Sequence, residues 1–266
     1  MRAAAVRRAE RGAGKGIVEG IVGDMAPMPG EDEASPSKFI SRHETTQAQW
    51  EALMDGNPSR FRGADLPVDN VTIAECLEFI SRLNRLPTVR EAGLEFRLPT
   101  EDEWKMSAVN DPFNPDALRF LTLPYSGEEE WHGAGWFLDN SGGTTHPVGQ
   151  KAANRSGFFD MWGNVAEPTA PPTGIISMDG MYGVQFGGFP CMGGSIRKNV
   201  TLFDGIRFVG GGLDSLPDEF KPLFDGMEVP EGAWEPLAPD DPRRDTIHGE
   251  TLGLRLAADK VAGKGP

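Results

Sequence analysis

Apolar residues recur at helical spacing in two stretches of the first third of the chain. In residues 45–54 the apolar side chains lie within helical reach of Trp50, and the pattern stops before a Gly-Asn-Pro sequence. In residues 72–83 apolar residues recur every three or four positions, and Pro87 follows shortly after the end. Both stretches predict amphipathic helices. Cys76 lies among the apolar positions of the second, where a free thiol is expected to act as a small hydrophobic group.

A capping box predicts a third helix. After a short strand-like run at residues 96–98, Thr100 is followed three residues later by Glu103, a pairing that satisfies the first amides of a helix. Helix initiation therefore explains these acids without catalysis. Beyond Asn110 the chain is dominated by glycine, proline and isolated aromatic residues, which favours a loop-rich domain with few and short regular elements.

Residues 1–36 differ from the rest in composition. They begin with several arginines and continue into a stretch rich in proline, glycine and acids. Because this composition buries little apolar surface, we predict an N-terminal arm, extended or flexible, followed by one domain over residues 37–266. The arm is expected to be dispensable for folding but to contribute to assembly, since its arginines oppose an acidic body.

Charge and cysteine content narrow the classes of partner. A formal net charge of −14 argues against nucleic acid as the main ligand, because neutralising phosphates requires a basic face; cations and basic partners stay open. The two cysteines, Cys76 and Cys191, lie far apart, so neither a disulfide framework nor a Cys-x-x-Cys metal site is predicted. The four histidines are isolated, so a histidine metal centre is not predicted either.

The hydropathy pattern predicts no membrane insertion. No run of about 18 apolar residues occurs, and the apolar stretch at residues 17–22 is too short and interrupted for a secretory signal. We expect a cytoplasmic or virion-associated location.

Eight segments resemble the formylglycine-generating-enzyme or sulfatase-modifying-factor family, and they follow one another along the chain in the family's order. Two of them read Arg-Leu-Pro-Thr-Glu-Asp-Glu-Trp at 97–104 and Gly-Phe-Phe-Asp-Met-Trp-Gly-Asn-Val-Ala-Glu at 157–167. The others are residues 44–50, 57–61, 66–71, 140–149, 193–195 and 253–256. The resemblance implies an α+β domain with the C-type-lectin-like fold, in which helices pack on small, twisted antiparallel sheets.

The chemistry of that family depends on two cysteines that closely follow a Gly-Gly-Ser motif. By the resemblance, their positions fall on Lys198 and Phe203 in this chain. Neither side chain can supply the thiolate that binds copper(I) or exchanges with a substrate thiol. Cys191 lies on the other side of the motif, four residues before Ser195, and a single thiol cannot form a bis-thiolate site.

The resemblance also implies calcium. One family site maps onto the side chains of Asp160 and Glu167 and the carbonyls of Gly163 and Val165, a set of oxygen ligands suited to a hard cation. Glu167→Gln should then remove the effect of calcium at little cost to the metal-free protein. The alternative is that Asp160 caps the turn and Glu167 bonds to the backbone.

A second family calcium site maps only in part. Its recognisable ligands are the side chain of Asn140 and the carbonyl of Gly142. An amide in place of a carboxylate weakens the attraction for the cation.

Two functions of different classes remain. The first is a non-catalytic binding or structural module that displays residues 196–251 to a protein or glycan partner, as a homo-oligomer or a component of a larger assembly such as a virion or surface complex. Aromatic residues flanked by charged residues in that segment suit such a contact. They would equally suit packing of the segment against the rest of the domain. The alternative is a divergent sulfatase-maturation-type oxidase, or another enzyme of the same superfamily, that uses unidentified residues.

Overall fold

The computed structural model describes residues 13–32, 34–109, 132–170 and 252–261, with four further strands between residues 176 and 208 described as backbone. The helices are α2 (Ala13–Asp24), α3 (Gln47–Leu53), α4 (Ile73–Asn84), α5 (Pro87–Ala92) and α6 (Glu101–Val109). The strands are β1 (Met25–Pro27), β2 (Lys38–Ser41), β3 (Leu94–Arg97), β4 (Glu167–Pro168), β5 (Ile176–Met178), β6 (Met181–Gly183), β7 (Gly188–Met192), β8 (Phe203–Phe208) and β9 (Ala257–Lys260). This mixture agrees with the predicted α+β class.

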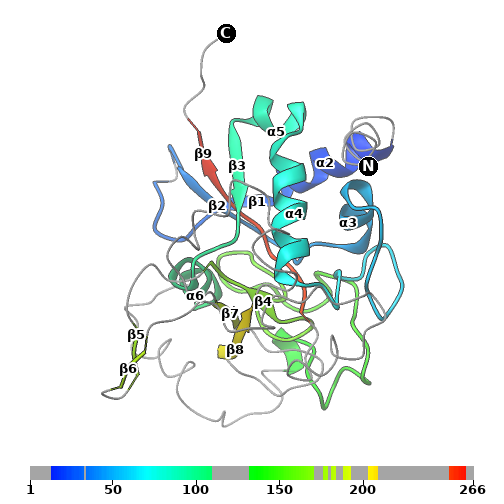
Figure 1. Ribbon diagram of the computed structural model, residues 1–266, viewed down its shortest axis with the longest axis vertical. Coiled ribbons are helices and arrows are strands. Elements are labelled where there is room, and N and C mark those ends of the chain that lie inside the picture. The colour runs from blue at the N-terminus through cyan, green and yellow to red at the C-terminus, as the bar shows by residue number, and fades with distance from the viewer. Residues whose placement is uncertain are drawn as a thin grey trace.

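The first sheet joins the two ends of the described chain. Its strand order is β1-β2-β9-β3, and each of its three pairings is antiparallel. Strand β9 therefore lies between β2 and β3, with Ala257 opposite Ile40 and Ala258 opposite Phe96. Figure 1 shows this sheet beside α2, α4 and α5.

A second, smaller sheet lies below the first in Figure 1 and has the order β4-β7-β8. Strand β7 pairs with β4 on one side, where Cys191 is opposite Pro168. On its other side β7 pairs with β8, where Met192 is opposite Phe203. Strands β5 and β6 form a separate two-stranded sheet. The second sheet thus reaches the start of the segment that the sequence assigns to display.

Both predicted amphipathic helices form, and each begins with a capping box. Thr46 accepts from the backbone of Gln49 in α3, and Thr72 does the same with Glu75 in α4. In each case the third residue bonds back to the cap, so amides that lack a partner in the first turn are satisfied.

The predicted capping box of α6 is confirmed and continues into a network of charges. The backbone of Thr100 donates to Glu103 at 2.9 Å, and the hydroxyl of Thr100 accepts from the Glu103 backbone at 3.2 Å. Glu103 also receives two bonds from Arg97, whose Nε donates to Asp259 at 2.7 Å. This network ties α6 to strands β3 and β9.

Helix α5 was not expected. Pro87, predicted only to follow the end of α4, is the first residue of α5. Proline suits this position because it needs no amide partner and its φ is already helical. The helix ends at Ala92 and is capped by Gly93, whose φ of 67° lies in the left-handed region.

The prediction of an extended or flexible arm over residues 1–36 is wrong for the part that forms α2 and β1. Val18 and Ile21 are 1% and 2% exposed, and both belong to the main hydrophobic core. Strand β1 pairs with β2, with Met25 opposite Ser41. The sequence interpretation gave weight to glycines and arginines, but a short helix is stabilised by the apolar face that it buries. Residues 1–12 lie outside the described part.

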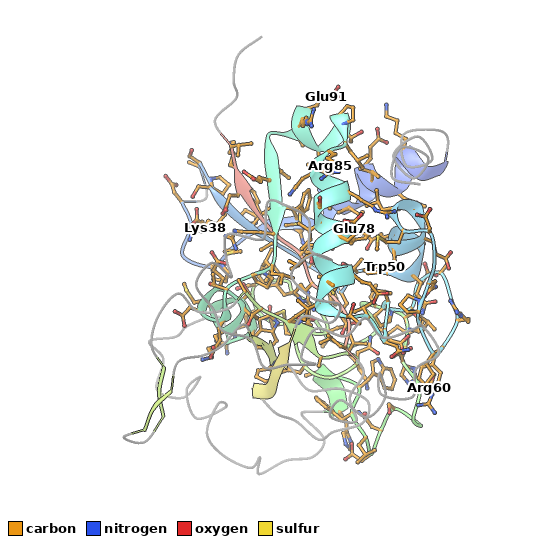
Figure 2. The ribbon with its side chains drawn as sticks, viewed as in Figure 1. Lys38, Trp50, Arg60, Glu78, Arg85 and Glu91 are labelled. Atoms are coloured by element: carbon orange, nitrogen blue, oxygen red, sulfur yellow. The ribbon has the colours of Figure 1, made fainter. Side chains whose placement is uncertain are left out.

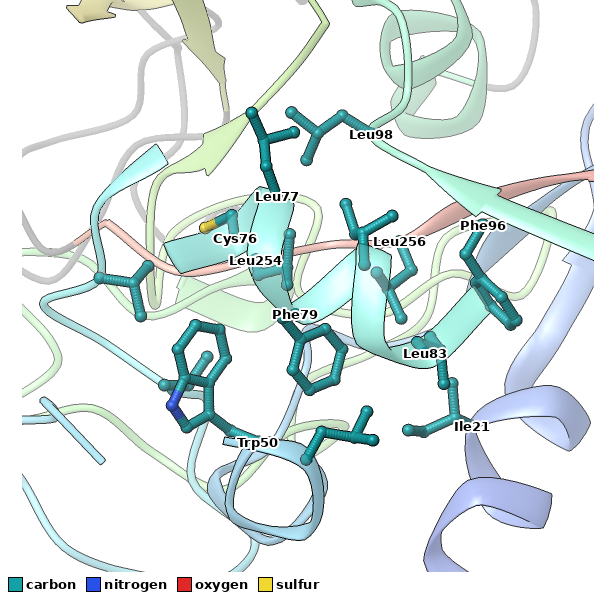
Figure 3. Close-up of a cluster of buried hydrophobic side chains, with 14 of the residues drawn as sticks. Ile21, Trp50, Cys76, Leu77, Phe79, Leu83, Phe96, Leu98, Leu254 and Leu256 are labelled. Atoms are coloured by element: carbon teal, nitrogen blue, oxygen red, sulfur yellow. The ribbon is translucent and has the colours of Figure 1, made fainter. Parts of the chain in front are cut away.

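The main core is built around α4. The rings of Trp50 and Phe79 stack with centroids 5.2 Å apart, and Leu254 lies in the same cluster (Figure 3). Cys76 is fully buried here, as predicted from its place on the apolar face. Figure 2 shows Glu78 among the side chains along α4.

None of the helices in the described ranges combines the length and the apolar character needed to cross a bilayer.

Candidate functional site

The turn that leads into β4 carries most of the predicted calcium ligands. Asp160, Gly163 and Asn164 have positive φ angles of 51°, 80° and 57°. Glycine is required at 163, because a Cβ there would lie 2.3 Å from the carbonyl oxygen of Trp136. The turn is therefore tight, and its backbone is pressed against the segment at Trp136.

Glu167, at the end of this turn, bonds to side chains. The Nε of Arg255 donates to both carboxylate oxygens at 2.8 Å, and Trp104 donates its ring NH to Oε2. Glu167 is 1% exposed and Arg255 is 0% exposed. Any cation that used Glu167 would share its oxygens with this guanidinium and this indole.

Arg255 uses its remaining donors on backbone carbonyls. Its two terminal nitrogens donate to Ser41 at 3.0 Å and to Phe159 at 2.8 Å. The guanidinium therefore joins the end of β2, the 160–167 turn and the segment before β9. This planar, multidentate arrangement is one that arginine can supply and lysine cannot.

Asp160 is less well satisfied than Glu167. Its Oδ2 accepts the backbone NH of Gly149 at 2.6 Å, whereas its Oδ1 is buried and has no hydrogen-bond partner among the described residues. Asp160 is 2% exposed, and burial raises its pKa. An orphaned carboxylate oxygen in a buried turn fits a cation ligand.

A third buried carboxylate, Glu44, faces the same turn. Its Oε2 accepts from the side chain of Asn164 at 2.7 Å, and its Oε1 accepts from the backbone of Val165 at 3.1 Å. Burial, with the negative charges of Asp160 and Glu167, raises the pKa of Glu44 well above its usual range.

Charge is not balanced within this cluster. Glu44, Asp160 and Glu167 are all buried carboxylates, and Arg255 is the buried cation among them. Three negative groups against one positive group leave two charges that need either protons or a further cation. The cluster therefore suits a divalent ion electrostatically at the Asp160 end, while Glu167 already has its own counter-ion.

Sequence reasoning selected Asp160, Gly163, Val165 and Glu167, and the fold brings them onto one turn. It did not single out Glu44 or Arg255. A signal existed at Arg255, which stands between two leucines in an apolar run just before a strand. A charged residue in such a run must find a buried partner.

The second predicted calcium site uses its amide within its own turn. The Oδ1 of Asn140 accepts from the backbone of Phe137 at 2.6 Å, and its Nδ2 donates to Gly135 at 3.0 Å. Gly142 follows with a φ of 65°. Throughout the described ranges, no group of three or more His, Cys, Asp or Glu side chains is arranged to hold a metal ion.

The positions relevant to thiol chemistry lie in different elements of the fold. Cys76 is 0% exposed, and its sulfur lies 3.9 Å from the carbonyl oxygen of Gly253. Phe203, at one of the two family cysteine positions, is the first residue of β8. Ser195 and Lys198 lie outside the described residues.

Comparison with known families assigns the chain. Residues 19–199 match the sulfatase-modifying factor enzyme 1-like domain, which is more than half of the 266 residues. The chain belongs to the sulfatase-modifying factor family. Its α+β architecture is accordingly the C-type-lectin-like fold that the sequence predicted.

Relatives of this sulfatase-modifying factor domain include the chaperone protein LppX of Paenibacillus barcinonensis, at 28% identity. That match covers 48% of this chain and 60% of LppX, so the chain spans less than two thirds of this curated relative.

Solved structures of similar fold share less sequence. Treponema denticola variable protein 1 has a TM-score of 0.48 at 23% identity, over 88% of this chain and 92% of its own. CarF has a TM-score of 0.47 at 17% identity, over 89% and 96%. PvdO from Pseudomonas aeruginosa has a TM-score of 0.44 at 17% identity, over 88% and 90%.

Proposed function

We propose that this member of the sulfatase-modifying factor family is a non-catalytic binding or structural module that presents residues 196–251 to a protein or glycan partner. The observation that carries the proposal is the state of its thiols. The chain has two cysteines, and Cys76 is completely buried in the core of α4. At most Cys191 could meet a substrate, whereas a bis-thiolate copper site needs two adjacent thiolates.

The small sheet, whose strand β8 belongs to the display segment, supports this proposal. Strands β7 and β8 lie on either side of residues 193–202, and residues 209–251 follow β8. Strand β4 pairs with β7, and its first residue, Glu167, is fastened to Arg255. A segment that starts from an anchored sheet is held in a defined place, which favours recognition of one fixed partner.

The absence of oxidase activity is tested directly. Purified protein, copper(I) and oxygen are incubated with a Cys-x-Pro-x-Arg peptide, and the peptide is followed by mass spectrometry. We expect no loss of the thiol in the wild type and none in Cys76→Ala. Catalytic conversion would overturn the proposal in favour of a divergent oxidase.

The display surface is tested by site-specific cross-linking. A photoreactive phenylalanine analogue replaces Phe220 or Trp234 in the display segment and, as a control, Leu138, which is 55% exposed on the body. Cross-links to a glycan panel, to a second copy or to co-purified protein should form from the segment and not from Leu138. Equal labelling from all three positions would remove the segment from the proposed role, and the assembly would have to use another face.

We also propose that one Ca²⁺ binds at the 160–167 turn. Asp160 would contribute its orphaned Oδ1, Gly163 and Val165 their carbonyls, and Glu167 an oxygen shared with Arg255. The charge balance supports this, since two positive charges would neutralise the excess of the buried cluster. The ion would supply charge compensation and rigidity to the turn.

A further inference from the structure

Glu44 belongs to no predicted ligand set, yet it contacts the 160–167 turn through both of its oxygens. It is 1% exposed and lies between β2 and α3, more than a hundred residues from the turn in sequence. We propose that Glu44 is a positioning residue, which holds the backbone around Val165 so that the carbonyls of Gly163 and Val165 stay aimed at the calcium ion. This inference rests on the calcium proposal.

The segment that carries Glu44 is rigid. The next residue, Thr45, donates its backbone NH to Leu254 at 2.7 Å and accepts from Val68 at 2.8 Å. On the other side, Ser41 donates to Leu256 at 2.9 Å. The residues around Glu44 are thus held by main-chain bonds to two separate parts of the chain, at Val68 and at residues 254–256, and the side chain of Glu44 acts from a fixed point.

Its partner in the turn is equally well oriented. The Oδ1 of Asn164 accepts from the backbone of His146 at 3.0 Å, so its Nδ2 is the group directed at Glu44. The same Nδ2 donates to the His146 carbonyl at 3.1 Å. The bonds of Asn164 therefore fix which atom of the amide faces the carboxylate.

The pair of bonds requires a carboxylate of this length. Asn164 and Val165 each present an NH, so both oxygens of residue 44 must accept. Glu44→Gln places an NH₂ against one of these donors. Glu44→Asp keeps the charge but is shorter by one methylene, so it cannot reach both donors from the same backbone. The two variants separate charge from position.

The test is the affinity for Ca²⁺ alone, measured by competition with a fluorescent chelator. The matched control is Glu75→Asp, since Glu75 also accepts two bonds, from the NH and hydroxyl of Thr72 in the α4 cap. We expect Glu44→Asp and Glu44→Gln each to weaken calcium binding by about 10- to 100-fold, the usual effect of losing an outer hydrogen-bond partner. Glu75→Asp should bind as the wild type does. Wild-type affinity in Glu44→Asp would overturn the positioning role and leave only a charge effect.

Failure of the calcium proposal is distinguished by amide exchange in the metal-free protein. If the wild type binds no calcium, the Val165 amide should still exchange faster in Glu44→Asp than in the wild type, with the Trp50 amide of α3 unchanged. Equal exchange at Val165 would overturn the role independently of the ion.

A double variant, in which the amide and the carboxylate exchange positions 44 and 164, tests the bond even if the single variants fold poorly. In Glu44→Gln two amide groups face each other, and adding Asn164→Asp restores one donor, one acceptor and the original charge. The double variant E44Q/N164D should recover stability and Val165 protection beyond the sum of its single changes. Simple additivity of the two changes would contradict a direct link between residues 44 and 164.

Discussion

The guanidinium of Arg255 faces the carboxylate of Glu167 in the interior of the protein, with Nε 2.8 Å from both oxygens. Arg255 lies just before β9 in the first sheet, and Glu167 begins β4 in the second. The pair therefore joins the two sheets across a long interval of sequence. Because both groups are removed from water, removing one partner leaves the other as an uncompensated buried charge.

The first prediction concerns this pair. Arg255→Met should lower the free energy of unfolding by about 3–5 kcal/mol, the usual cost of breaking a buried pair. Arg255→Lys should be intermediate, because it keeps the charge but cannot reach Glu167, Ser41 and Phe159 together. Urea denaturation measures the series. The control, Arg90→Lys on the exposed side of α5, should stay within about 0.5 kcal/mol of the wild type; an equally small change at Arg255 would contradict the role.

The second prediction concerns calcium at Asp160. Added Ca²⁺ should raise the melting temperature. At a hundredfold excess over Kd, it should raise the free energy of unfolding by about 2.7 kcal/mol, and Mg²⁺ should stabilise the protein poorly. Asp160→Asn should remove this effect without destabilising the metal-free protein, because asparagine accepts the positive φ and a buried charge disappears. A melting temperature that ignores both chelator and calcium would reject the metal.

The structure changes what is expected of Glu167→Gln. Sequence reasoning predicted little cost to the metal-free protein. The bonds from Arg255 make this substitution destabilising even without calcium, since the arginine would lose its charged partner. Asp160→Asn is therefore the cleaner variant, and the difference in melting temperature between the two metal-free proteins tests this revision.

The third prediction is a pH dependence that originates at Asp69. Burial raises the pKa of Asp69 to about 6, despite bonds from Ser59 and the backbone of Arg60. The folded protein therefore holds this proton more tightly than the unfolded chain. The protonated carboxyl of Asp69 therefore contributes fully to the free energy of unfolding below about pH 4. This contribution of roughly 3 kcal/mol is lost as the pH rises through about 6.

Asp69→Asn should flatten that dependence, because it keeps an oxygen for the Arg60 amide and cannot ionise. Urea denaturation of both proteins at pH 4.5 and pH 7 supplies the comparison. We expect the wild type to lose stability relative to Asp69→Asn at the higher pH. Parallel changes in the two proteins would show that the carboxyl of Asp69 is ionised at both pH values.

The fourth prediction concerns α2. Ile21 is 2% exposed in the main core, so Ile21→Ala should cost about 2–5 kcal/mol. Glu19 is on the same helix with a side chain 58% exposed and one ion pair to Lys15, so Glu19→Ala should cost no more than about 0.5 kcal/mol. Both are measured by urea denaturation. A harmless Ile21→Ala would restore the interpretation of this segment as a dispensable arm.

Local patterns in the sequence were sufficient for the elements with short-range causes. The apolar period at 72–83 predicted α4, and the pair Thr100 and Glu103 predicted the start of α6, because caps and helix faces depend on residues within two turns. The burial of Cys76 followed from the same period. The order of family-like segments predicted the fold class.

Other features could not be predicted from the sequence, because the residues that stabilise them are distant in the chain. Helix α2 has weak helical character, with four glycines at 14, 16, 20 and 23, and it is stabilised by packing against α3 and α5. No local signal reports such a contact. The pairing of β9 between β2 and β3 is also set by the whole fold.

The candidate site divides in the same way. The resemblance carried by the sequence was enough to select Asp160, Gly163, Val165 and Glu167, because these residues belong to one short family-like segment. Only the tertiary structure decided the partners: Arg255 for Glu167 and Glu44 for Val165, from opposite ends of the chain. Burial is the physical reason, because in a low dielectric a charge is tolerated only beside a group that compensates it. That group can come from any part of the sequence.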